Sequence, residues 1–231
     1  MWRLFLKNKA YIFDTESTGR VEPQIIESCI MSVFGPENLT LGNPVTKRFK
    51  PDKEIEFGAL ATHHIHLHEL EGCPSHKEFI LPNDSKYLIG YNVDYDWEAA
   101  LNSGKQPLLK RIDLLPLSRY LYPELDSYKQ IAVFYSIKGP SGKEMAKKAH
   151  SAEDDVMICE CILEHILNIL KPETWEELWQ FSEEAKVPLY MPVGKYKGLH
   201  MSEIPEDYKK WFLSQPDVNP YLRKALLKKD W

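Results

Sequence analysis

The stretch that decides the fold is YIFDTESTG, residues 11–19. The apolar and aromatic run Ala10 to Phe13 predicts a buried strand, and Asp14 and Glu16 follow it, separated by one residue. Residues i and i+2 of an extended chain point to the same face, so both carboxylates are expected to face one site. A carboxylate pair suits a hard cation such as Mg²⁺, which prefers oxygen ligands. A solvated turn is the alternative, and this stretch alone favours the turn.

The composition is that of an ordinary globular chain. Its 231 residues suffice for one large domain or for one domain with a small appendage. Apolar residues make up 43% and charged residues 27%, which suggests neither disorder nor a fibrous repeat. The four cysteines form no C-x-x-C pair, so no disulfide framework or zinc ribbon is indicated and a reducing cytoplasm fits best.

No targeting or membrane segment is expected. The apolar part of the N-terminal stretch MWRLFLKNKAYIF is too short for a signal peptide, and Lys7 and Lys9 interrupt it. Nothing later approaches the roughly 18 apolar residues of a membrane span. We therefore expect no membrane partner.

Charge is unevenly spread along the chain. The formal net charge is -5, yet residues 186–231 hold nine Lys and Arg against five Asp and Glu. The acidic excess therefore belongs to residues 1–185. A carboxylate cluster that binds divalent metal would lower the formal charge without repelling phosphates, because bound ions can invert the local field.

Strand and helix patterns alternate, which predicts an α/β domain over residues 1–185 and a separate small module over 186–231. Expected strands are 10–13, 25–34, 45–49 and 87–91, and a further strand runs into a short helix at 112–122. Helices are expected at 96–103, 151–170 and 173–185, with a Gly/Pro loop at 138–143. Ser151 and Thr174 are the expected N-caps.

Further acids stand at two helix starts. Asp96 follows the 87–91 strand, with Asp94 as a competitor, and His150 precedes Asp155 by five residues. Each acid by itself is better explained as a cap or dipole partner. Taken together, four carboxylates and one histidine at strand ends and helix starts are what two-metal phosphodiester hydrolysis needs.

The ordered motifs D-x-E, N-x-x-Y-D and H-x-A-x-x-D resemble those of the DnaQ-like (DEDDh) 3′→5′ exonucleases over about residues 10–170. The IIE of residues 25–27 and ALATHHIH of residues 59–66 are similar to secondary features of that family. The tail MPVGKYKGLHMSEIPEDYKKWF, residues 191–212, is similar to that of the exodeoxyribonuclease X subgroup. Departures are Tyr95, where Phe is usual, the additional Asp94, and Ser151 in place of a basic residue.

The resemblance implies an RNase H-like fold, a mixed five-stranded sheet flanked by helices, with a small helical C-terminal module. It implies that Asp14, Glu16, Asp96 and Asp155 hold two Mg²⁺ or Mn²⁺ ions and that His150 is the general base. The implied activity is 3′→5′ hydrolysis of single-stranded or duplex-end DNA in repair. The alternatives are an exoribonuclease of the same fold and a proofreading-type accessory subunit of a polymerase.

Several residues are expected to meet the substrate. Thr15, Ser17, Thr18 and Gly19 adjoin the first two acids, and Asn92 precedes the second motif. His63 falls on a substrate-side position of the family, although a structural role is an alternative and a zinc site among the nearby histidines has little support. Glu27 is expected to orient a metal ligand or its water, since an acid in an apolar strand needs a partner.

The basic tail predicts a small helical module. Lys195, Tyr196 and Lys197 lie between Gly194 and Gly198, followed by a helix near 205–213 and a last helix capped by Asn219. Lysines with an interleaved aromatic residue can bind backbone phosphates and stack on bases. A solvated appendage that packs on the nuclease is the alternative.

Overall fold

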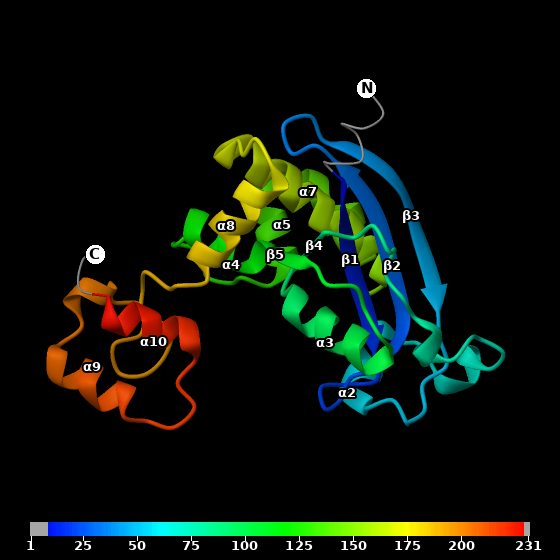
Figure 1. The fold of residues 1–231 in the computed structure, drawn as a ribbon, viewed down its shortest axis with the longest axis horizontal. Coiled ribbons are helices and arrows are strands. Elements are labelled where there is room, and N and C mark those ends of the chain that lie inside the picture. The colour runs from blue at the N-terminus through cyan, green and yellow to red at the C-terminus, as the bar shows by residue number, and fades with distance from the viewer. Residues whose placement is uncertain (1–8, 229–231) are drawn as a thin grey trace.

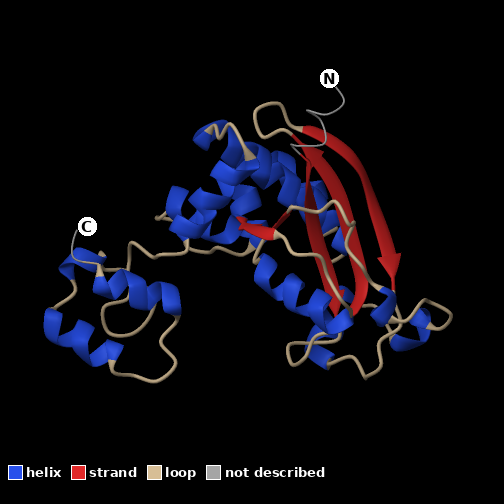
Figure 2. Cartoon of the chain, in the orientation of Figure 1, coloured by secondary structure: helices blue, strands red, loops and turns tan. Residues whose placement is uncertain are grey.

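The computed structural model describes residues 9–228, and its centre is a mixed five-stranded sheet in the order β3-β2-β1-β4-β5 (Figures 1 and 2). The strands are β1 (Lys9–Ser17), β2 (Ile25–Phe34), β3 (Thr40–Arg48), β4 (Tyr87–Gly90) and β5 (Lys110–Asp113). The pairs β1–β2 and β2–β3 are antiparallel, whereas β1–β4 and β4–β5 are parallel. The expected mixed five-stranded α/β architecture is confirmed.

Helices flank this sheet and form the C-terminal part of the described chain (Figure 2). The α-helices are α2 (Phe57–His63), α3 (Val93–Ser103), α4 (Leu114–Leu121), α5 (Gln130–Lys138), α6 (Lys143–Ala146), α7 (Ala152–Leu170), α8 (Trp175–Ala185), α9 (Glu206–Leu213) and α10 (Pro220–Leu227). Short 3₁₀ turns are η1 (Leu67–Leu70), η2 (His76–Glu78), η3 (Gly139–Gly142) and η4 (Met201–Glu203). No helix within residues 9–228 has the length and apolar character needed to cross a bilayer.

Alternation along β1 separates two hydrophobic clusters. Ala10 and Ile12 belong to the cluster that includes residues of α4, α5, α7 and α8. Tyr11 and Phe13 belong to a cluster with residues of α3. Since successive side chains of a strand point to opposite faces, the even-numbered Asp14 and Glu16 continue the face covered by α7.

Helix α7 forms where its periodicity predicts. The Ser151 hydroxyl caps its N-terminus by accepting a hydrogen bond from the Asp154 N–H at 3.2 Å. Its fully buried residues include Val156, Ile162 and Ile166. Burial of each such side chain contributes about 1.5–3 kcal/mol, so this face anchors the helix on the sheet. The first turn of α7, with Asp155, is thereby held beside β1.

Some boundaries differ from expectation. Strand β1 extends to Ser17 instead of ending at Phe13, because Asp14 pairs with Cys29 and Glu16 with Glu27 across the antiparallel ladder. The acids therefore lie inside the strand. Strand β3 covers 40–48 instead of 45–49, and α3 begins at Val93. The expected loop at 138–143 forms η3. Helices α2, α5 and α6 were not predicted, since helices this short owe their stability mainly to tertiary packing, which no local pattern shows.

The C-terminal segment has its own hydrophobic cluster. Buried Met191, Met201, Ile204, Leu222 and Leu226 form it with other residues of 187–226. Figure 1 shows α9 and α10 side by side, away from the sheet. The expected caps are present, since the Asn219 Oδ1 accepts from the Tyr221 and Leu222 N–H groups. The assignment of 186–231 as a separate domain stays a prediction.

Two of the sequence expectations include some residues that lie outside the described range 9–228. The N-terminal stretch examined for a signal peptide includes residues 1–8, and the tail includes 229–231, which both lie outside the described residues. All four cysteines lie within the range, and all are free thiols. The reducing-cytoplasm expectation stays a prediction.

Candidate active site

Three carboxylates converge where β1 meets the start of α7. Ligand oxygens of Asp14, Glu16 and Asp155 all lie within 4.8 Å of one another. Asp14 and Glu16 share one face of β1, and Asp155 stands in the first turn of α7. A β-bulge falls between Glu16 and Ser17, where β1 shifts its register against β2. Bulges re-aim side chains beside functional sites, and this one ends the regular pairing just after the acids.

Burial and the mutual repulsion of their charged forms raise the pKa values of the clustered acids. Burial, together with the charges of Asp96, Asp155 and Glu16, raises the pKa of Asp14 well above its usual range. Burial and the nearby Asp155 raise the pKa of Glu16 to about 9. Burial also raises the pKa of Asp155, against the hydrogen bond from the His150 N–H. An all-oxygen donor set whose ionised forms repel one another fits a hard divalent cation, which would offset that repulsion.

Asp96 joins the cluster from α3 through Thr15. Its Oδ1 accepts hydrogen bonds from the Thr15 N–H at 3.0 Å and from the Thr15 hydroxyl at 2.7 Å. Asp96 is buried, and burial raises its pKa to about 7. Its carboxylate is not one of the three groups that converge within 4.8 Å, yet it contributes the largest charge effect on Asp14.

Gly90 lets α3 approach β1 this closely. A Cβ at Gly90 would lie 2.9 Å from the Val93 side chain and 3.1 Å from the Phe13 carbonyl oxygen. Both distances are too short for a side chain. The glycine at the end of β4 therefore permits the turn into α3, which carries Asp96 to Thr15.

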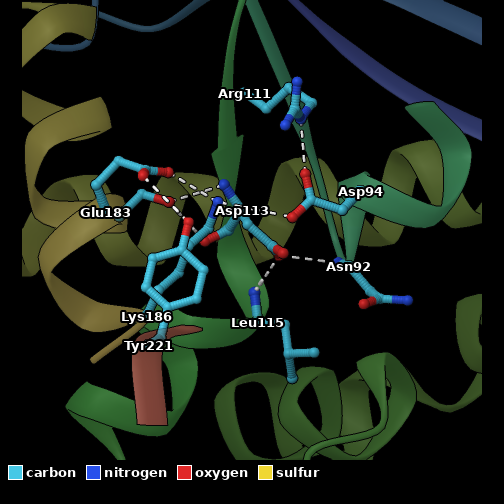
Figure 3. A network of polar contacts seen from close by, with 9 residues as sticks. Asn92, Asp94, Arg111, Asp113, Leu115, Glu183, Lys186 and Tyr221 are labelled. Carbon is cyan, nitrogen blue, oxygen red and sulfur yellow. Dashed lines mark hydrogen bonds and ion pairs between the residues drawn. The ribbon is translucent and has the colours of Figure 1, made fainter. Parts of the chain in front are cut away.

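Asp94 belongs to a different network of polar contacts, which Figure 3 shows. Its carboxylate is exposed, accepts a hydrogen bond from the Arg111 Nε at 2.6 Å and lies 3.7 Å from the Lys186 Nζ. Lys186 also pairs with Glu183 at 2.7 Å, and Glu183 accepts a bond from the Tyr221 hydroxyl of α10 at 3.4 Å. The sequence left Asp94 and Asp96 as competitors, and the geometry favours Asp96.

His150 lies at the rim of the cluster. It is exposed, and its φ of 80° is in the left-handed region that residues other than glycine disfavour. Its backbone N–H donates to Asp155 Oδ2 at 3.2 Å, which ties the loop to the acid. The imidazole therefore stands in solvent next to the carboxylates.

Glu27 connects β2 to α7. Its Oε2 accepts from the Arg48 Nε at 2.8 Å, and its Oε1 accepts from the Ala152 N–H at 3.3 Å. Ala152 is the first residue of α7, so the carboxylate meets the positive end of the helix dipole. Glu27 holds the first turn of α7, and with it Asp155, against the strand. The sequence predicted that this buried acid has a partner but did not identify that partner.

Tyr95 ties the loop after Glu16 to α3. Its hydroxyl lies 2.6 Å from the Ser17 Oγ and donates to the Gly19 carbonyl at 2.9 Å. The Glu56 carboxylate lies over Gly19, where a Cβ would collide with it, and it accepts from the Arg20 N–H at 3.3 Å. Sequence reasoning missed Glu56, because no local pattern relates it to Gly19.

The other residues expected to contact the substrate differ in whether their side chains are already hydrogen-bonded within the protein. The Thr18 hydroxyl accepts from the Gln24 N–H at 3.1 Å, so it, like Thr15, is used inside the protein. His63 is buried, its Nδ1 accepts from the Ile65 N–H at 3.0 Å, and among residues 9–228 its Nε2 has no hydrogen-bond partner. Burial lowers the pKa of His63.

Asn92 and the tail residues lie outside the acid cluster. Asn92 is exposed with a left-handed φ of 64°, and its N–H donates to the buried Asp113 at 2.9 Å. Lys195 and Lys197 are exposed, and Tyr196 is half-buried. All three residues precede α9 in the sequence. Among the described residues, the grouping of potential metal ligands is that of Asp14, Glu16 and Asp155, and no histidine cluster joins it.

These features define the class: the chain has the DnaQ-like exonuclease fold, with an acid cluster at β1 and α7. A solved structure described as "Exonuclease X in complex with 5' overhanging duplex DNA" shares 21% identity at a TM-score of 0.60, covering 75% of this chain and 99% of that chain. The fold expectation is therefore confirmed.

Other solved structures with this fold are those of E. coli exonuclease I. Its complex with single-stranded DNA in a zinc-bound form gives 18% identity and a TM-score of 0.53, covering 76% of this chain and 42% of that chain. Its complex with a dA16 oligonucleotide gives 18% and 0.54, covering 79% and 46%. The present chain thus spans under half the length of exonuclease I.

Sequence comparisons add one match, in the C-terminal part. Residues 184–217 match the family described as "Putative quorum-sensing-regulated virulence factor". That match covers the end of α8 through α9, including Lys195 to Lys197. No curated protein sequence matches the chain significantly.

Proposed function

We propose that this protein is a divalent-metal-dependent 3′→5′ exonuclease that hydrolyses phosphodiester bonds from the 3′ end of DNA and serves in DNA repair. The observation that carries the proposal is the convergence of Asp14, Glu16 and Asp155, with Asp96 alongside. The fold is shared with solved exonucleases whose complexes contain DNA. Catalysis of this reaction needs preorganised charge at the phosphate, which an acid cluster supplies once cations bind.

Asp14, Glu16, Asp96 and Asp155 would hold two Mg²⁺ or Mn²⁺ ions. When bound, such ions activate water, stabilise the leaving 3′ oxygen and orient the phosphate. The raised pKa values of Glu16 and Asp14 mean that metal binding displaces protons from the cluster. The carboxylates act as ligands rather than as bases.

His150 is the proposed general base. Its exposed imidazole lies on the residue whose N–H bonds Asp155, so it can reach a water at the cluster and release the proton to solvent. A positioned imidazole is the side chain that most often serves as a general base. Its left-handed backbone angle, a conformation that costs about 1–3 kcal/mol, supports a functional constraint on the loop.

Substrate contacts are proposed for two regions. Near the cluster, Ser17 and Gly19 are fixed by Tyr95, and His63 is proposed to contact the terminal nucleotide. Thr15, Thr18 and Asn92 are also proposed as substrate residues. Lys195, Tyr196 and Lys197 are proposed to bind the strand outside the active site.

The test offers 5′-labelled single-stranded DNA, duplex DNA and RNA to the protein with Mg²⁺, Mn²⁺ or EDTA. Successive shortening from the 3′ end of DNA is expected with either metal and none with EDTA. Asp155→Asn should abolish the activity, whereas Asp154→Asn, one position earlier on the same helix, should retain most of it. His150→Ala should lower kcat by about 100-fold or more.

Two outcomes would change the proposal. Hydrolysis that survives EDTA and Asp14→Ala would refute the metal-dependent mechanism. Hydrolysis of RNA alone would replace the substrate by RNA and make the protein an exoribonuclease, since the 2′-OH is the group by which proteins distinguish the two.

A further inference from the structure

The C-terminal segment carries an exposed tryptophan at the end of a row of aromatic rings. Trp211 of α9 exposes 54% of its surface. Its ring centroid lies 5.2 Å from that of Tyr208, which lies 4.7 Å from that of Tyr196. The Lys195 Nζ stands 5.1 Å from the Tyr196 centroid. We call these four residues the Trp211 surface.

The turn before α9 is built to hold this surface together. Gly194 has a φ of 79°, and a Cβ there would collide with the Tyr208 hydroxyl. The same hydroxyl accepts a hydrogen bond from the Lys195 N–H at 3.2 Å. A glycine is therefore required at this point, and the 194–198 turn is fixed against α9.

Trp211 is not explained by packing. The hydrophobic cluster of the segment includes Tyr196, Tyr208 and Phe212 among its half-buried members, but Trp211 remains mostly exposed. Because the exposed ring ends a row with Tyr208 and Tyr196, it offers a flat face on which a planar ligand could stack.

Exposed lysines lie on the same segment as this ring. Lys195, Lys197 and Lys210 are exposed, and none of them makes an ion pair within residues 9–228. The acids at the start of α9 are engaged, since Glu206 pairs with Lys209 at 2.8 Å and Asp207 accepts from the Tyr208 N–H at 2.8 Å. Exposed lysines on the same segment as an exposed aromatic ring favour a polyanion with flat groups over an apolar protein partner.

We propose that the Trp211 surface is a second nucleic-acid site that binds single strands, with a base stacked on Trp211 and backbone phosphates held by Lys195, Lys197 and Lys210. The inference deepens the proposed function and rests on it for the biological role of the strand. The bases of a duplex are paired and stacked on one another, so they are not free to stack on Trp211. The site therefore distinguishes single strands from duplexes.

The test measures binding by fluorescence anisotropy, with the full-length protein, EDTA and a fluorescein-labelled oligothymidine of about 20 nucleotides. Loss of one base–aromatic stack costs about 1–3 kcal/mol, so Trp211→Ala should raise the Kd by about 5- to 100-fold. Trp211→Phe should raise it less, because phenylalanine still stacks. The matched control is Tyr120→Ala, which removes another 54%-exposed aromatic residue, from α4, and should leave the Kd unchanged.

Salt dependence tests the lysines. Lys197→Ala should reduce the slope of log Kd against log salt by about 0.7, as expected for one phosphate contact on a single strand. A blunt duplex of equal length should bind more weakly than the single strand and should lose little affinity in Trp211→Ala. Equal losses on both would assign the surface to the backbone alone and overturn the single-strand site.

Unchanged affinity of Trp211→Ala, or an equal loss in Tyr120→Ala, would also overturn it. The readout in EDTA is independent of hydrolysis. A protein that cleaves DNA but binds without Trp211 refutes only this inference, and one that binds through Trp211 but never cleaves refutes only the proposed exonuclease.

Discussion

Neutralising one acid of the cluster should stabilise the metal-free protein. Glu16→Gln replaces a buried carboxylate, whose pKa burial and Asp155 raise to about 9, by a neutral amide of similar shape. In the unfolded chain the pKa of a glutamate is about 4.5. Folding at pH 7 must therefore protonate Glu16, which costs about 1.4 kcal/mol for each of the roughly 2.5 pH units between 4.5 and 7, or about 3 kcal/mol.

The sign and the pH window follow from this raised pKa. The native state binds the Glu16 proton more tightly than the unfolded state, so the contribution of Glu16 to stability is greatest below about pH 4.5 and falls as the pH rises toward about 9. Glu16→Gln removes that slope. At pH 7 its free energy of unfolding should exceed that of the wild type by up to about 3 kcal/mol, and its Tm by up to about 10 °C for a chain of this length.

Thermal unfolding in EDTA between pH 4.5 and 9 measures the effect. The matched control is Glu27→Gln, the residue directly opposite Glu16 on β2. Glu27 is paired with Arg48 and the start of α7, so its loss should instead destabilise the protein by about 1–3 kcal/mol. A Glu16→Gln protein that melts below the wild type in EDTA at pH 8 would refute the reasoning.

Adding Mn²⁺ should reduce the stability difference between the two proteins. A ligand that binds only the native state stabilises it by about 2.7 kcal/mol at 100 times its Kd, and the wild type should gain this. Glu16→Gln lacks one ligand and should gain less. Equal Mn²⁺-induced shifts in Tm would show that Glu16 does not bind the cation.

Three further substitutions test how the site is assembled. Asp96→Asn should lower kcat by at least about 100-fold, whereas Asp94→Asn should leave kcat within a few-fold. Steady-state hydrolysis of labelled DNA compares the two variants. The reverse order would reject Asp96 as the acid of the site. Tyr95→Phe removes the hydroxyl bonded to Ser17 and should raise KM about 5-fold with little change in kcat, so an unaltered KM counts against its positioning role. Gly90→Ala introduces a Cβ 2.9 Å from its neighbour and should lower the free energy of unfolding by about 1–3 kcal/mol, measured by urea denaturation; full stability would contradict the close approach of α3 to β1.

Local patterns in the sequence determined several elements. Strand β2 spans the residues that its run of branched side chains predicts, and α7 begins after the expected Ser151 cap. The same-face relation of Asp14 and Glu16 follows from the two-residue period of a strand alone. These features depend on neighbours within a few positions of each other, so their physics is readable along the chain.

Other features were decided only when distant segments met. Strand β1 runs on through its acids because β2 supplies hydrogen-bond partners, which a propensity pattern does not contain. Asp96 is held beside β1 by hydrogen bonds from Thr15, which lies 81 residues earlier, whereas Asp94 pairs with Arg111. Tyr95 reaches Ser17 across 78 residues in the same way.

The sequence by itself therefore determined the α/β order, the main caps and the set of acids, since periodicity and capping act locally. Tertiary structure alone decided which acids converge, what Glu27 holds and which face of α9 leaves Trp211 exposed. The physical reason is that burial and charge repulsion depend on distances through space, which are set only when the sheet and its helices pack together.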